Sequence, residues 1–239
     1  MQTAFQEHFN HNSTSIYSDH ALSLDTLRDS SLCDENSYMQ IKSLDQLYEA
    51  PVDKISVTVL DDLRQLKEVD LQGLNLVVLV VPHDVMMPED SSFKNTLVYR
   101  KAPEQSSQSA LDLIAMSIIE FSNYGGLISI DQQDFKDALA FSHTRYFSIH
   151  RYSLDEFKSI ALQPDFIAQI KDINNFMIMM YVHEDMEAQK YNPVVCAIID
   201  AANHHVADDS FVDADLYIAY KKLRDTSQPE HFYLLHAAI

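Results

Sequence analysis

Two aspartates, Asp131 and Asp134, stand three residues apart at the start of a predicted helix, shortly after two adjacent glycines. Asp131 fits the N-cap position of that helix, and Asp134 fits its third helical position. Carboxylates there accept hydrogen bonds from free backbone N–H groups and interact favourably with the helix dipole. An acid can cap its own helix and still face a partner, so the residue types leave both roles open.

The glycine pair that precedes these acids is Gly125–Gly126. The chain has only three glycines, and the third, Gly73, lies far upstream. Glycine is the residue that accepts positive φ angles and lets a backbone approach another group closely. A chain this poor in glycine that places two together therefore requires that backbone shape at this turn.

Two further clusters contain the residue types that bind metals, within His183–Asp185 and His204–Asp209. Neither has the H-E-x-x-H spacing that puts two histidines on one helix face, and both lie in predicted loops, where polar residues are common. We therefore expect no metal and no cofactor.

Nucleophile chemistry has little support in the sequence. Cys33 and Cys196 are the only cysteines, and neither lies in a local catalytic signature. Cys196 falls in an apolar helical pattern, which favours a small buried residue over half of a disulfide. The G-x-S-x-G turn of serine hydrolases is absent.

Composition limits the classes of partner. The chain has 239 residues, 46% of them hydrophobic, and 36 acidic side chains against 17 Lys and Arg, which gives a formal net charge of −19. This balance argues against binding a nucleic-acid backbone or an anionic membrane surface. The N-terminal sequence has neither a positive start nor an apolar stretch, so we expect a cytoplasmic protein.

The glycine pair and the acids must be positioned by the helix that precedes them. Leu111–Phe121 is apolar on nearly all sides, which predicts burial between two layers. Asp112 and Glu120 interrupt it, and it is too short to span a membrane.

Upstream of this helix the pattern predicts a strand–helix–strand unit. Lys54–Leu60 alternates and Leu74–Val81 is a near-continuous apolar run, which is typical of a central parallel strand. A short helix from Asp61 to about Val69 joins them. The remaining segments are predicted as a loose arm (residues 1–18), a short helix (Asp19–Arg28), a strand running into a helical turn (Ser37–Leu47) and a loop (Ser91–Gln108).

Downstream of the glycines we predict a helix at Gln132–Ala140 and four strands. The strands are Thr144–Tyr152, Phe176–Val182, Phe211–Tyr220 and Phe232–Ala238. A helix begins at Ser153, with Glu156 completing a capping box; Pro164 interrupts it, and a second turn continues to about Ile173. Another helix spans Asn192 to about Ala202.

The segment Ile118–Leu139 resembles the end of the core helix and the catalytic loop of the tubulin homologue FtsZ. In that family a Gly-Leu-Ile/Met-Asn turn precedes Asp-x-x-Asp at the start of the next helix. The matching residues here are Gly126, Leu127, Ile128, Ser129, Asp131 and Asp134. Ser129 stands where the family has asparagine, and Gly125–Gly126 replaces its Pro-Gly. The order of elements over roughly residues 105–239 is also similar to the FtsZ C-terminal domain.

The resemblance implies a shortened α/β fold of the tubulin/FtsZ type. A buried core helix (105–123) would lie between an N-terminal α/β layer and a C-terminal domain (124–239) with a four-stranded sheet and helices. Residues 19–104 would be a reduced remnant of the GTPase domain, preceded by a flexible arm (1–18).

One departure from the family is decisive for function. A tubulin-type GTP site needs a glycine-rich loop whose N–H groups surround phosphates, and Gly73 is the only glycine before Gly125. About 110 residues precede the core helix, too few for the full nucleotide-binding domain.

The resemblance therefore implies a non-enzymatic protein that interacts with FtsZ or with itself and caps or regulates filaments in cell division. In the family, the matching acids reach into the nucleotide pocket of the next subunit and help to position the water that attacks GTP. The interaction loop implied here comprises Gly125, Gly126, Leu127, Ser129, Asp131 and Asp134. The alternatives are a small hydrolase or metal-dependent enzyme with a site assembled from loops, or a scaffold domain that has lost both assembly faces.

Overall fold

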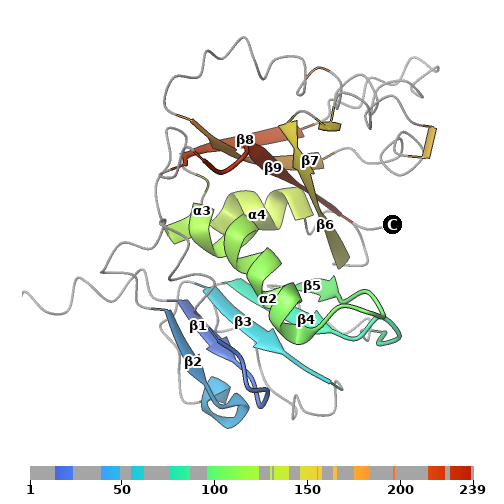
Figure 1. Cartoon of the computed structure of the whole chain (residues 1–239). Coiled ribbons are helices and arrows are strands. Elements are labelled where there is room, and N and C mark those ends of the chain that lie inside the picture. Colours follow the sequence, from blue (N-terminus) through green and yellow to red (C-terminus); the bar gives the residue numbers. More distant parts are fainter. Residues whose placement is uncertain are drawn as a thin grey trace, which may run out of the picture.

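The chain forms an α/β fold built on one mixed nine-stranded sheet (Figure 1). The computed structural model describes residues 14–23, 39–48, 55–61, 76–86, 96–123, 130, 132–139, 146–154, 156–157, 164–165, 175–183, 196, 215–223 and 227–237. The strands are β1 (Thr14–Tyr17), β2 (Met39–Lys42), β3 (Ile55–Val59), β4 (Leu76–Val81), β5 (Thr96–Arg100), β6 (Tyr146–Ser153), β7 (Asn175–Val182), β8 (Asp215–Lys222) and β9 (His231–Ala237).

The strands lie in the order β2-β1-β3-β4-β5-β6-β9-β7-β8. Neighbours from β2 to β6 in this order are parallel. Strand β9 is antiparallel to both β6 and β7, while β7 and β8 are parallel to each other. The sheet therefore has a parallel N-terminal half and a mixed C-terminal half.

The predicted strands at Lys54–Leu60 and Leu74–Val81 are confirmed as β3 and β4, and they pair in parallel. All six residues of β4 are buried. Its residues alternate between two apolar clusters, one on each face of the sheet, which explains why this strand lacks an apolar–polar alternation. The predicted strand and helical turn at Ser37–Leu47 are also confirmed, as β2 and the short helix η2 (Leu44–Tyr48).

Two predictions for the N-terminal half are wrong. The last residues of the expected loose arm form β1, whose four residues are buried between β2 and β3. The expected loop at Ser91–Gln108 contains β5, which lies between β4 and β6. Both strands are only four or five residues long and are flanked by polar residues, so their neighbours in the sheet, not their own pattern, specify them. The start of the helix expected at Asp19–Arg28 is also wrong, because residues 19–23 form bends and irregular backbone.

The predicted apolar helix is present, and it spans residues 107–123, within the expected core-helix bounds of 105–123. It consists of α2 (Ser107–Ile114), a π-helical segment η6 (Ala115–Ile119) and α3 (Glu120–Asn123). The Ser106 side chain caps its start by accepting a hydrogen bond of 3.1 Å from Ser109 N–H. Apolar side chains of this helix share one core cluster with residues of β3 and β4 and with residues of β7 and β9.

The four strands predicted near the C-terminus are present as β6, β7, β8 and β9, and residues 211–214 of the third predicted strand lie outside the described residues. They do not form a sheet of their own. Strand β6 also pairs with β5, at Val98 with Tyr146 and Tyr99 with Phe147, and this joins the two halves into one sheet.

The predicted helix at Gln132–Ala140 is confirmed as α4 (Gln132–Leu139). Phe135, Ala138 and Leu139 on this helix are buried, and the helix contacts β7, β8 and β9. The helical turn predicted after β6 begins as expected, because Ser153 Oγ accepts a hydrogen bond of 3.1 Å from Glu156 N–H. The helix predicted from Asp61 to about Val69 lies outside the described residues, apart from Asp61 itself.

Candidate functional site

The structure describes only one acid of the predicted interaction loop. Gly125, Gly126, Leu127, Ser129 and Asp131 lie outside the described residues. Asp134 is half-buried in the first turn of α4, where a carboxylate interacts favourably with the helix dipole. Its contact with a partner molecule stays a prediction.

The helix that leads into this loop ends on a buried ion pair. Lys221 Nζ of β8 lies 2.8 Å from Glu120 Oε1 and 3.1 Å from the Glu120 carbonyl oxygen. The side chain of Glu120 is 4% exposed and that of Lys221 is 12% exposed. The sequence indicates that Glu120 needs a partner, because an acid within an apolar helix is rarely buried unless it is paired. The ion pair fixes the start of α3 to the C-terminal half of the sheet.

A second contact fixes the π-helical segment to the same half. The Tyr181 hydroxyl of β7 donates a hydrogen bond to the Met116 carbonyl oxygen. The Tyr181 ring also packs edge-to-face against Phe121, with centroids 5.2 Å apart. A π-helical turn departs from the regular i to i+4 hydrogen-bond pattern, and such turns often occur at functional sites. The end of the helix is therefore held by two β-strands that lie far from it in sequence.

The N-terminal half of the sheet has a topological switch point between β1 and β3. The chain runs outward from β1 to β2 and then returns across β1 to β3. In open parallel sheets, ligands bind beyond the carboxyl ends of the strands at this point. The residues there are Ser18, Asp19 and His20 after β1, and Asp61 after β3.

A histidine–aspartate pair spans this switch point. His20 Nε2 lies 3.1 Å from Asp61 Oδ1, with the side chains 31% and 62% exposed. The Ser18 hydroxyl accepts a hydrogen bond of 2.9 Å from the backbone N–H of His20.

The charges at this edge disfavour a phosphate. Asp19 and Asp61 both place carboxylates beyond the strand ends, and Asp19 Oδ1 accepts a hydrogen bond of 3.4 Å from Leu44 N–H. None of the three glycines of the chain falls within the described residues. The described edge therefore offers carboxylates where a phosphate site would need converging N–H donors.

The other candidate residues do not assemble into a site within the described part of the chain. No group of three or more His, Cys, Asp or Glu residues there could hold a metal ion. Of the two sequence clusters with metal-binding residue types, only His183 is described, and its backbone N–H donates to Glu230 Oε1 at 3.0 Å. Cys196 is helical and has a free thiol. The prediction that it is buried is wrong, because the residue is exposed to solvent. An apolar sequence pattern does not specify which side of a helical turn faces the solvent.

Comparisons with known proteins support the fold. No protein-family model and no curated protein matches the sequence. An empty FtsZ dimer from M. jannaschii is similar in structure, with a TM-score of 0.55 and 12% identity, over 94% of this chain and 87% of that chain. TubZ from Bacillus thuringiensis serovar israelensis, in GDP-form protofilaments, has a TM-score of 0.45 and 12% identity, over 81% of this chain and 64% of its own. The chain therefore has an FtsZ-like fold at low sequence identity. No helix in the described ranges is long and apolar enough to cross a membrane.

Proposed function

We propose that this chain is a non-enzymatic FtsZ-like protein that binds FtsZ or a second copy of itself and caps or regulates filaments. The fold supports a cytoskeletal-like role, because the similarity to FtsZ extends over 94% of the chain. The helix that ends at Asn123, held to β8 by the Glu120–Lys221 ion pair, leads along the chain toward the loop at residues 125–134.

The observation that carries the proposal is the His20–Asp61 pair of 3.1 Å at the switch point. A nucleotide bound at this edge would bring its phosphates against the carboxylates of Asp19 and Asp61. Like charges in close contact repel, and the sequence has only Gly73 before Gly125, so it lacks the glycine-rich loop that surrounds phosphates in a tubulin-type GTP site. We therefore propose that the chain neither binds nor hydrolyses GTP.

Filament capping follows from having one competent face. A head-to-tail assembly needs two complementary patches on every subunit. In this chain the loop at Gly125–Asp134 would serve as one patch, and the second patch, at the nucleotide edge, would be missing. Such a subunit can add to the end of a filament, but no further subunit can then bind to it. In this arrangement Asp131 and Asp134 lie over the nucleotide of the exposed end of an FtsZ filament.

The test is co-sedimentation with FtsZ polymerised in GTP, alongside FtsZ kept in GDP as the control without filaments. We expect the chain in the pellet only with filaments, and shorter filaments in electron micrographs. Calorimetry should show no GTP binding, and phosphate release by the chain alone should equal that of buffer.

Two results would contradict this proposal. GTP turnover above the buffer control would identify an enzyme. Absence from the FtsZ pellet, combined with a monomeric mass in sedimentation velocity, would remove both partners and leave a scaffold role.

A further inference from the structure

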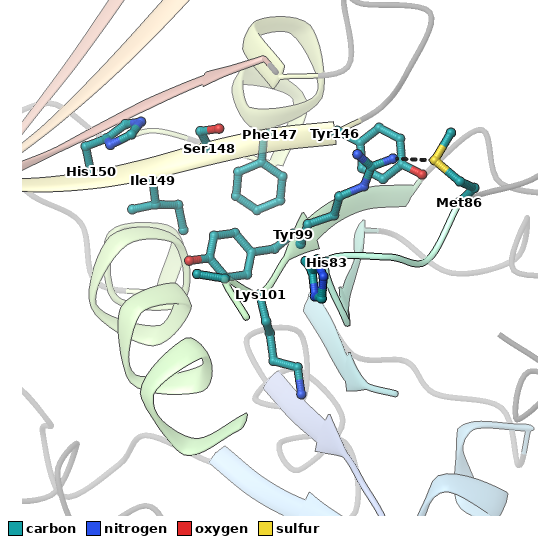
Figure 2. Close-up of a pocket in the computed structure, with 11 residues that line it drawn as sticks. His83, Met86, Tyr99, Lys101, Tyr146, Phe147, Ser148, Ile149 and His150 are labelled. Carbon is teal, nitrogen blue, oxygen red and sulfur yellow. Dashed lines mark hydrogen bonds between the residues drawn. The ribbon is translucent and has the colours of Figure 1, made fainter. Parts of the chain in front are cut away.

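A cavity of about 530 Å³ lies where β5 and β6 separate (Figure 2). The two strands pair at only two positions, after which β6 continues beside β9. The lining residues are His83, Met86, Tyr99, Arg100, Lys101, Ala102, Tyr146, Phe147, Ser148, Ile149 and His150. The volume lies within the range of roughly 300–1,000 Å³ that is usual for small-molecule sites.

The charge of this cavity is opposite to that of the chain. None of the described residues that line it is acidic, although the chain has 36 acidic side chains against 17 Lys and Arg. Arg100 and Lys101 follow each other along the cavity wall. Lys101 Nζ donates a hydrogen bond of 2.8 Å to Ser107 Oγ. The ammonium group of Lys101 is therefore engaged by Ser107, and Arg100 is the candidate cation for binding a ligand in the cavity.

The Arg100 guanidinium is positioned by two contacts, and neither of them is with a carboxylate. Its Cζ lies 3.6 Å from the centroid of the Tyr146 ring, and its Nη2 donates to Met86 Sδ at 3.1 Å, the contact drawn as a dashed line in Figure 2. A thioether is a weak acceptor. The Arg100 Nε is buried with no partner, and no carboxylate among the described residues pairs with the guanidinium. The buried Nε is closed to a ligand, but a guanidinium without a carboxylate partner forms charge-assisted hydrogen bonds with oxyanions, so an oxyanion in the cavity would be stabilised.

Besides Arg100 and Lys101, the described cavity wall is mainly aromatic and aliphatic, with His83, Ser148 and His150 as its other polar residues. The rings of Tyr99 and Phe147 lie with centroids 5.8 Å apart and, in Figure 2, between His150 at one end and Tyr146 with Met86 at the other. Ile149 adds an aliphatic wall beside them. The two rings are inclined to each other by 51°, and such an aromatic surface suits contact with an apolar ring of a ligand.

We propose that this cavity binds a small molecule that carries a carboxylate or similar oxyanion on an apolar aromatic group. The Arg100 guanidinium binds the oxyanion, and the Tyr99 and Phe147 rings contact the apolar group. This proposal goes beyond the interaction with FtsZ and does not depend on it, since the cavity lies between β5 and β6 and not at the loop of residues 125–134.

The test is calorimetric titration of the full chain with naphthoate, a flat aromatic carboxylate, and with uncharged naphthamide. We expect saturable binding of naphthoate and binding of naphthamide weaker by about tenfold or more. R100Q should reduce naphthoate affinity to the level of naphthamide. R151Q, which removes an exposed arginine of β6 outside the cavity, should leave the affinity unchanged.

A second variant keeps the test decisive if R100Q does not fold. Ala102 is exposed at the cavity wall, so A102F should fill the cavity while circular dichroism stays unchanged. Loss of naphthoate binding in A102F supports the site. Unchanged affinity in A102F or in folded R100Q, equal affinity for naphthamide, or no saturable binding by the unmodified chain would overturn the proposal.

Discussion

Glu120 and Lys221 form a buried ion pair of 2.8 Å between residues 101 positions apart in the sequence. The same Lys221 Nζ lies 5.7 Å from the centroid of the Phe121 ring and donates to the Glu120 carbonyl oxygen. The ammonium group thus satisfies a side chain and a backbone group at the point where η6 becomes α3. This pair holds the last turn of the helix against the C-terminal half of the sheet, five residues before the predicted interaction loop begins at Gly125.

We predict that K221M destabilises the chain by about 3–5 kcal/mol, because it leaves the Glu120 carboxylate buried without a partner. The free energy of unfolding can be measured by urea denaturation followed by circular dichroism, which suits a chain without tryptophan.

The matched control is K222M, which removes the neighbouring exposed lysine. It should change the free energy of unfolding by less than about 0.5 kcal/mol. The double variant E120Q/K221M should recover much of the loss, since an amide is far cheaper to bury than a carboxylate. Equal losses in K221M and K222M would show that the ion pair is not what stabilises this region.

The sequence predicted the apolar elements well, because their patterns reflect burial on one or both faces. The run Leu76–Val81 is buried on both faces, and the helix that contains Leu111 and Ile118 is buried in the core cluster. By contrast, β1 and β5 are short segments between polar residues, and their place in the sheet depends on neighbours distant in sequence.

The sites were harder to predict than the elements. An acid at position 120 signals a buried partner, but its spacing does not identify Lys221. The cationic cavity depends on where β5 and β6 part after Tyr99 and Phe147, and this register is a property of the assembled sheet. The sequence pattern alone therefore places Arg100 in the loop predicted at Ser91–Gln108.

We predict that the stability of the chain falls between about pH 6.5 and pH 4 partly because of His236. Burial lowers the pKa of His236 to about 4, and its Nε2 has no hydrogen-bond partner among the described residues. In the unfolded chain the pKa is near 6.5. Within this window the unfolded state binds a proton that the folded state does not, so this contribution falls with decreasing pH by up to roughly 1.4 kcal/mol per pH unit.

The difference between the unmodified chain and H236F isolates this contribution from that of other titrating groups. H236F keeps a ring next to His150, whose ring stacks on that of His236 at 5.3 Å. Urea denaturation at several pH values should show a shallower pH dependence in H236F. H83Q, which removes an exposed histidine, serves as the control and should follow the unmodified chain. Parallel curves for H236F and the unmodified chain would contradict the assignment.

We predict that S106A destabilises the chain by about 1 kcal/mol, because Ser106 Oγ accepts the Ser109 N–H at the start of α2. The matched variant S109A changes an equally exposed serine inside the helix, where alanine is the better helix former. It should be neutral or slightly stabilising in thermal unfolding. If S106A and S109A have the same midpoint, the cap does not contribute to stability.

The last prediction separates the two roles of the acids at the start of α4. Asparagine is itself a good N-cap, so D131N/D134N should leave the fold and thermal midpoint nearly unchanged. If the acids act across an interface, the same double variant should abolish the effect of the chain on FtsZ filament length and GTP turnover. D137N serves as the control, because Asp137 is an exposed acid later on α4, where Gln133 Nε2 donates to it at 2.7 Å. A D131N/D134N protein that still shortens filaments as the unmodified chain does would reduce both acids to helix caps and place the FtsZ contact elsewhere on the molecule.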